Sequence, residues 1–156
     1  MSVKLIAVGR NMPDWVNTAF SDYVKRLPSD FKLELTEIKA EHRGKSEAIA
    51  PIIQREGEKL LAAVPSGHIT IALDERGQQW STQELANRLH AYRLDSRKIC
   101  LLIGGPDGLS DQCREQADSI WSLSKLTLPH PLVRVMIAEQ IYRAWSILNH
   151  HPYHRD

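Results

Sequence analysis

The chain has few of the features that mark membrane, secreted or disulfide-stabilised proteins. Its 156 residues include only two cysteines, Cys100 in an apolar strand pattern and Cys113 in a polar helix pattern. They do not form a CxxC pair, so we expect both to be reduced and neither to be catalytic. No apolar run is long enough to cross a bilayer. The amino terminus has no basic leader, and we expect a cytoplasmic protein with no membrane partner.

The chain also has almost no net charge. Its 20 Lys and Arg residues nearly balance 19 Asp and Glu residues, for a formal charge of +1. The field of the whole molecule therefore does not attract nucleic acid, and any RNA binding depends on local basic clusters. Such clusters occur at 25–26, at 42–45 and in the tail with His150, His151, His154 and Arg155. Taken singly, each is better explained as solvated surface.

Several common catalytic motifs are missing. The segment Gly104-Gly105-Pro106-Asp107-Gly108 is not a P-loop, because no Gly-Lys-Ser/Thr follows it, and it is not the dinucleotide fingerprint. This argues against a nicotinamide-type or other phosphate-binding nucleotide enzyme. No G-x-S-x-G elbow is present, which argues against a Ser/His/Asp hydrolase. The tail histidines have no Cys or acidic cluster at ligand spacing, so we expect no metal.

Strand and helix patterns alternate along nearly the whole chain. We predict strands at 3–9, 31–39, 68–74, 98–103 and 122–128, and helices at 13–27, 46–64, 81–94, 110–118 and 131–149. The strand at 98–103 is the most hydrophobic of these, as in a parallel sheet buried on both faces. This alternation predicts an α/β domain with a largely parallel sheet and helices on both faces.

Local signals give further detail. Trp15, Ala19, Tyr23 and Leu27 form an i, i+4 stripe in the first helix. Ser46 is expected to open the second helix, with Pro51 in an irregular first turn, and 75–77 is expected to form a turn. Ser81 and Glu84 form a capping box at the start of the third helix.

Two loops near the carboxyl end are candidates for ligand binding, because ligands of open α/β sheets bind at the carboxyl ends of the strands. The 104–108 loop carries no Lys or Arg, and Asp107 would repel a phosphate. The loop suits an uncharged or cationic ligand, such as the nucleoside of S-adenosylmethionine. An ordinary tight turn explains the Gly-Gly-Pro sequence equally well. In the second loop, Pro129 and Pro131 stop the preceding strand and stiffen the backbone that presents His130.

The last helix is apolar nearly all round, which predicts burial on several sides and a subunit interface. Glu139 and Arg143 form an i, i+4 pair on its polar remnant. Arg134 lies instead on the apolar stripe, near Ile137 and Ile141, and its guanidinium requires a partner or a ligand. An interface ion pair and a functional role explain Arg134 equally well.

The sequence resembles a known family over essentially its full length. It is similar to the RlmH (YbeA-type) small SPOUT methyltransferases, which methylate N3 of a pseudouridine in 23S ribosomal RNA. Asp107 stands where we would expect Glu, a conservative departure. The matching segments are Val8-Gly9, Met12-Pro13-Asp14-Trp15, Arg43-Gly44-Lys45, the run 101–109, the run 126–135, Glu139-Gln140-Ile141-Tyr142-Arg143-Ala144-Trp145 and Tyr153-His154-Arg155.

The resemblance implies one domain over residues 1–156, a three-layer α/β/α fold with a carboxy-terminal trefoil knot, and a homodimer. It implies S-adenosylmethionine as methyl donor, and 23S rRNA in the large subunit or intact ribosome as substrate, with no DNA partner. The tail residues Tyr153, His154 and Arg155 would reach the RNA, plausibly across the dimer interface. The implied donor-binding residues are Leu73, Gly104, Gly105, Leu123, Ser124, Lys125, Leu126, Thr127 and Leu128.

For such a reaction the uracil N3 must lose its proton before it attacks the methyl group. From residue chemistry and placement, Arg134 is our candidate for the cation that stabilises the ring anion. His130 and His154 are the candidates for the proton acceptor. A non-catalytic, ribosome-associated RNA-binding protein is the alternative, which explains the basic tail but not the donor loops.

Overall fold

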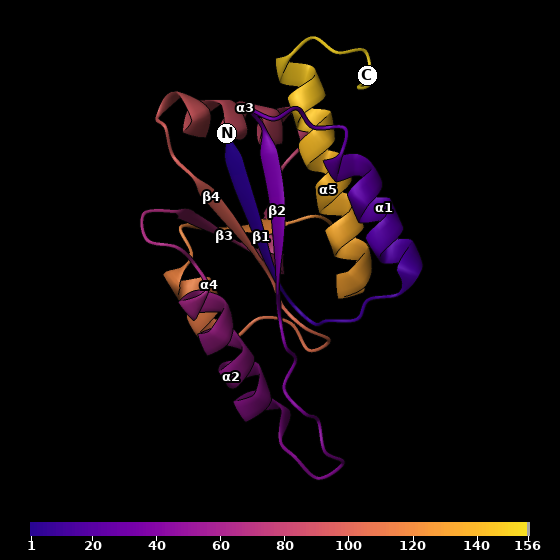
Figure 1. Cartoon of the computed structure of the whole chain (residues 1–156). Coiled ribbons are helices and arrows are strands. Elements are labelled where there is room, and N and C mark those ends of the chain that lie inside the picture. The colour runs from indigo at the N-terminus through magenta and orange to yellow at the C-terminus, as the bar shows by residue number, and fades with distance from the viewer. Residues whose placement is uncertain (156) are drawn as a thin grey trace.

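Five strands form one parallel sheet in the computed structural model, which describes residues 1–155. The strands lie in the order β2-β1-β4-β3-β5 (Figure 1) and are β1 (Ser2–Val8), β2 (Lys32–Ile38), β3 (Ile69–Gln79), β4 (Ile99–Ile103) and β5 (Ser119–Ser122). The helices are α1 (Asp14–Val24), α2 (Ile49–Ala62), α3 (Thr82–Leu94), α4 (Asp111–Gln116) and α5 (His130–Leu148). The predicted α/β class and parallel sheet are confirmed. Asp156, the last residue of the predicted domain, lies outside the described residues.

The side chains of β1 and β4 alternate between two apolar cores. One core packs under α1, α3 and α5 and includes Val3, Leu5, Ala7, Ile99, Leu101 and Ile103. The other packs under α2 and α4 and includes Ile6, Val8, Cys100 and Leu102. Every residue of β4 is buried, as a strand covered on both faces requires. Figure 1 shows α1 beside α5, and α2 beside α4 away from them.

Helix α5 contacts both α1 and α3 over the sheet. Ile137, Ala138, Ile141 and Ala144 are almost completely buried there. Further toward its amino end, apolar side chains of the helix stay half-buried, among them Leu132, Val135 and Met136. Contacts within one chain therefore account for part of the apolar pattern of this helix.

The starts of the first two helices differ from the predictions. α2 begins at Ile49 after an Ala48 N-cap that makes no side-chain hydrogen bond, so Ser46 is not the cap. Pro51 lies in the first turn, where its missing N–H leaves no hydrogen bond unmade. In α1 the buried side chains are Val16 and Phe20, whereas Trp15 is 57% exposed. The predicted stripe starting at Trp15 is therefore wrong at its amino end. The capping box of α3 is confirmed.

Strand β3 continues through the segment predicted to be a turn. Leu73 and Gln78 both pair with Trp121 of β5, so residues 74–77 are an insertion within the strand. A Cβ atom at Gly77 would lie 2.5 Å from the carbonyl of Ile120. The backbone there approaches β5 too closely for a side chain, which is why glycine stands at this position.

Strand β5 ends at Ser122, so the strand predicted at 122–128 is wrong. The Ser122 hydroxyl donates to the Ser124 carbonyl at 2.8 Å, and the Ser124 hydroxyl accepts from the Leu126 N–H at 3.0 Å. These side-chain bonds replace the strand ladder with a turn. Leu126 consequently projects outward and is 71% exposed.

Candidate functional site

A pocket of about 700 Å³ lies at the carboxyl ends of β3, β4 and β5. Its walls come from residues 73–76, from 103–109, and from the segment between Trp121 and Val133. The position agrees with the general location of ligand sites in open α/β sheets. Three chain segments far apart in the sequence therefore meet around one cavity.

The predicted donor-binding residues converge on this pocket. Those that line it are Leu73, Gly104, Gly105, Leu123, Ser124, Leu126, Thr127 and Leu128. Lys125 is the exception, because it is exposed and does not belong to the lining. Trp121 also lines the pocket; its indole N–H is buried and has no hydrogen-bond partner in the described part of the chain.

The glycine loop 104–108 is both a tight turn and a wall of the pocket. The Gly108 N–H donates to the Gly105 carbonyl at 3.0 Å, and Gly108 has a φ of +85°. A Cβ atom at Gly104 would lie 2.5 Å from the carbonyl of Gly108. Only glycine at 104 permits this turn. The loop is therefore a tight turn that also forms a wall of the pocket.

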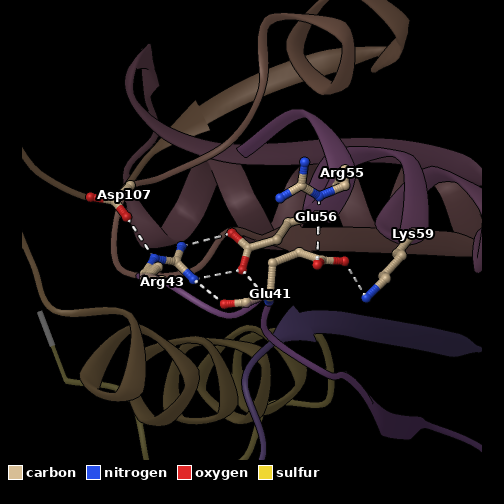
Figure 2. Close-up of polar contacts among 6 residues, drawn as sticks. All are labelled: Glu41, Arg43, Arg55, Glu56, Lys59 and Asp107. Carbon is tan, nitrogen blue, oxygen red and sulfur yellow. Dashed lines mark hydrogen bonds and ion pairs between the residues drawn. The ribbon is translucent and has the colours of Figure 1, made fainter. Parts of the chain in front are cut away.

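The carboxylates at the pocket are paired with cations. Asp107 accepts from Arg43 Nε at 2.9 Å, and Asp74 accepts from Arg114 Nη1 at 3.2 Å. Arg43 also binds the buried carboxylate of Glu56 through both terminal nitrogens (Figure 2). Figure 2 also shows Glu41 close to Lys59, at 2.6 Å between their charged atoms. The charge that Asp107 carries is thus balanced from outside the glycine loop.

Arg43 and Glu56 form an ion pair beside the pocket that the sequence analysis did not predict. The sequence placed Arg43 in a basic cluster best explained as solvated surface, yet it is paired with Glu56 and Asp107 and only partly exposed. A signal was available: Glu56 occupies the same helical stripe as the buried Ile52 and Leu60. An acidic group at an apolar stripe position requires a cation, by the reasoning already applied to Arg134.

His130 lines the pocket at the first residue of α5. Its Nδ1 atom is buried and has no hydrogen-bond partner within residues 1–155. Burial lowers the pKa of His130, and the nearby Arg134 and Arg43 cations lower it further, against an opposing effect of Glu56. The imidazole is therefore neutral at pH 7 and able to accept a proton.

Arg134 lies one turn further along α5, outside the pocket lining. Its side chain is 1% exposed. The guanidinium donates to Glu37 at 2.6 Å and to the Gly9 carbonyl at 2.8 Å. Arg134 thus joins α5 to the carboxyl ends of β1 and β2. Its partner is within the same chain.

The tail folds back on the far end of α5. Tyr153 donates its hydroxyl hydrogen to Glu139 at 3.0 Å, and its ring lies under the Arg143 guanidinium. His154 Nδ1 lies 3.3 Å from Arg143 Nη1, and Arg143 makes the predicted pair with Glu139. With α5 rising about 1.5 Å per residue, Glu139 and Arg143, the residues that the tail contacts, lie roughly 14 and 20 Å along the helix from His130. One chain does not bring the tail residues 153–155 to its own pocket (Figure 1).

Within residues 1–155, no helix is long and apolar enough to span a membrane. In the same part of the chain, no group of three or more His, Cys, Asp or Glu side chains is arranged to hold a metal ion.

Comparison with known proteins gives three findings. Residues 1–154 match the family described as "Predicted SPOUT methyltransferase". The chain is 54% identical over 155 residues to a Marinomonas sp. (strain MWYL1) protein named "Ribosomal RNA large subunit methyltransferase H", covering 99% of this chain and 100% of that one. It is also similar to the structure of a probable methylase family protein from Haemophilus influenzae Rd KW20. That likeness has a TM-score of 0.59 at 12% identity, covers 99% of this chain and 70% of the other, and concerns the fold alone.

Proposed function

The chain belongs to the SPOUT methyltransferase family, and we propose that it methylates N3 of a pseudouridine in 23S ribosomal RNA on the assembled ribosome, with S-adenosylmethionine as donor. The name and 54% identity of the Marinomonas relative support an rRNA substrate. The observation that carries the proposal is the pocket, where the insertion within β3 and the loops after β4 and β5 gather nearly all of the predicted donor-binding residues.

The pocket suits a cationic nucleoside. Its walls combine apolar side chains with the carboxylates of Asp74, Glu75 and Asp107. The lining cation Arg114 is engaged by Asp74 and Asp111, so it is not free to bind a pyrophosphate. Bound in the pocket, S-adenosylmethionine supplies an electrophilic methyl group on its sulfonium.

Within this pocket His130 is the proposed base. If the pKa of the uracil N3–H lies roughly two units above neutral, removing its proton costs about 2.7 kcal/mol. A neutral imidazole at the pocket wall is suited to receive that proton. His154 remains the second candidate, and it requires the tail of another subunit. Positioning the acceptor in line with the methyl group is the other main contribution expected of the protein.

Arg134 is the proposed source of positive charge for the ring anion. Because Glu37 and Gly9 already occupy its guanidinium, it would act through its field from beneath the pocket rather than by direct contact. Burial is the main cause of the lowered pKa of His130, and the same cation lowers it further. Arg134 also holds the first turns of α5 in place, so its loss would affect both roles.

We propose that the enzyme is a homodimer of one-domain subunits. The half-buried Leu132, Val135 and Met136 on α5 leave apolar surface for a partner. The tail contacts Glu139 and Arg143 and does not line the pocket of its own chain, which suits delivery of Tyr153, His154 and Arg155 to the partner's pocket. The family resemblance further implies a trefoil knot, a topology that is rare among folds. The meeting of the 104–108 and 123–129 loops at one pocket is compatible with it.

Two measurements test the proposal. A thermal-shift assay with S-adenosylmethionine separates the enzyme from the non-catalytic RNA-binding alternative, which would give no shift. Transfer of a labelled methyl group to intact ribosomes, isolated large subunits and bare 23S rRNA then identifies the substrate. We expect a donor-dependent shift and label at one pseudouridine of the intact ribosome. A protein that neither responds to the donor nor labels any of the three substrates would overturn the proposal.

A further inference from the structure

Arg43 lies in the loop between β2 and α2 and joins three parts of the chain. Its terminal nitrogens donate to both oxygens of Glu56, each at 2.9 Å. Its Nε donates to Asp107 in the glycine loop at 2.9 Å, and Nη1 also reaches the Glu41 carbonyl at 3.1 Å (Figure 2). One guanidinium thus links its own loop, helix α2 and a wall of the pocket.

The anchor of this arrangement is Glu56. Its side chain is 2% exposed, and its Oε2 also accepts from the Glu41 N–H at 3.0 Å. A carboxylate buried to this degree must remain paired, because an unpaired charge in the interior is strongly unfavourable. Arg43 is therefore held on Glu56, and the rigid fork of the guanidinium then fixes the direction of Nε toward Asp107.

The glycine loop rests on this ion pair. A Cβ atom at Gly105 would lie 3.3 Å from Glu56 Oε1 and 3.6 Å from Arg43 Nη2. Asp107, two residues on, is 34% exposed and forms its ion pair with Arg43. The backbone of the loop and its one charged side chain are thus both placed by the same pair.

We propose that Arg43 is a positioning residue for the methyl-donor pocket, holding the 104–108 loop in its donor-binding shape through Asp107. This inference rests on the proposed function. Arginine is required because it binds Glu56 with two nitrogens while a third reaches Asp107. A lysine keeps the positive charge beside Glu56 but has a single nitrogen, and so loses the link to the loop.

Calorimetric titration with S-adenosylmethionine tests the proposal on the full-length wild type, Arg43→Lys, Asp107→Ala and the double variant. We expect each single change to weaken donor binding about tenfold, the size typical of coupled neighbours. The double variant should bind no more weakly than the weaker single variant, because both changes break one link. In turnover, KM for the donor should rise about tenfold while kcat at saturating donor stays within about twofold.

Lys59→Ala is the matched control. Lys59 belongs to the same charged cluster, where it pairs with Glu41 at 2.6 Å, but it does not touch Asp107. The donor affinity and KM of Lys59→Ala should equal those of the wild type. If the substitutions instead acted by disrupting the whole charged cluster, donor binding would be weakened in every variant, Lys59→Ala included.

The outcomes are distinct. Wild-type donor affinity in Arg43→Lys and Asp107→Ala, or additive losses in the double variant, would overturn the inference. Should Arg43→Lys fail to fold, Asp107→Ala is compared with Asp107→Asn, whose amide oxygen can still accept from Arg43 Nε but carries no charge. Weakened donor binding in Asp107→Ala with near-normal binding in Asp107→Asn supports the link, and equal losses in both variants would overturn it. No donor binding by the wild type would instead remove the proposed function, and the inference with it.

Discussion

The imidazole of His130 sits where protonation is disfavoured. Burial is the largest cause of its lowered pKa, followed by the charges of Arg134 and Arg43. A group with this environment is neutral at physiological pH and gains a proton only in more acidic solution than a free histidine does. That is the behaviour required of a general base working near neutrality.

The first prediction concerns the pH dependence of methyl transfer. Only the neutral imidazole accepts a proton, so the rate should fall as the pH drops through the lowered pKa of His130, below the ordinary 6.5. His130→Gln should reduce single-turnover rates by about 10²–10⁴-fold and remove this acid-side inflection. Rates measured from pH 5 to 9 on both proteins provide the check. An inflection that persists in the variant would assign it to another group.

A second prediction concerns Gly104. In Gly104→Ala the new methyl group would lie 2.5 Å from the Gly108 carbonyl, so the turn must open. We expect a loss of about 1–3 kcal/mol in unfolding free energy, as for other overpacked sites, together with loss of measurable donor binding. Gly44→Ala is the control, because its nearest neighbour is the flexible Glu47 side chain at 3.4 Å. Denaturant unfolding and calorimetry on both variants make the comparison. Normal donor affinity in Gly104→Ala would show that the turn is not part of the site.

At the scale of elements, the buried cation of Arg134 adds a polar link between α5 and the ends of two strands. Arg134 is 1% exposed and bonds to Glu37 at the end of β2 and to the carbonyl of Gly9 after β1. Strand ends and helix start are thereby held together at the edge of the sheet where the pocket lies. The arrangement explains why a charged residue occurs on an otherwise apolar stripe.

A third prediction follows for Glu37→Gln. The change leaves the buried Arg134 without its counter-ion, so we expect a loss of about 1.5–3 kcal/mol, the range for hydrogen bonds to charged groups. Asp22→Asn is the control, because Asp22 pairs with Lys25 and Arg26 at the surface. Exposed pairs of this kind contribute at most about 1 kcal/mol. Urea unfolding compares the two, and equal small losses would mean that Arg134 does not depend on Glu37.

At the scale of the whole molecule, the tail and the pocket lie at opposite ends of α5. Glu139 and Arg143 lie roughly 14 and 20 Å along α5 from His130, at about 1.5 Å per residue. Tyr153 and His154 contact Glu139 and Arg143, near the carboxyl half of the same helix. If the tail contributes to the reaction, geometry requires that it serve the pocket of another chain.

The fourth prediction is complementation between two inactive chains. One carries His130→Gln, and the other ends after His151 and so lacks the tail. In a heterodimer, the intact pocket of the second chain faces the intact tail of the first, and about half of the wild-type activity should return, as expected for one of two equivalent sites. Differently tagged chains purified as the heterodimer make the measurement possible. A heterodimer as inactive as its parents would place the tail in its own subunit.

Local patterns predicted much of this architecture, for reasons visible in particular residues. The strongly hydrophobic segment 98–103 indicated burial on both faces, and β4 within it is buried throughout. Ser81 and Glu84 indicated where α3 begins, because a capping box involves only residues that are close in the sequence. The strand predicted at 122–128 was wrong, since the side chains of Ser122 and Ser124 bond to nearby backbone and end β5 early.

The sequence alone determined the order of the elements, the two-sided burial of the central strands and the need for a partner at Arg134. These properties depend on the periodicity of apolar residues and on the identity of single residues. Both can be recognised in the sequence without knowing the fold. Only the tertiary structure decided that Arg43 neutralises Glu56 and Asp107, that three loops enclose one pocket, and that the tail lies far from it. Such facts depend on which distant segments meet, because charges separated along the chain interact only where the packed elements bring them within a few ångströms.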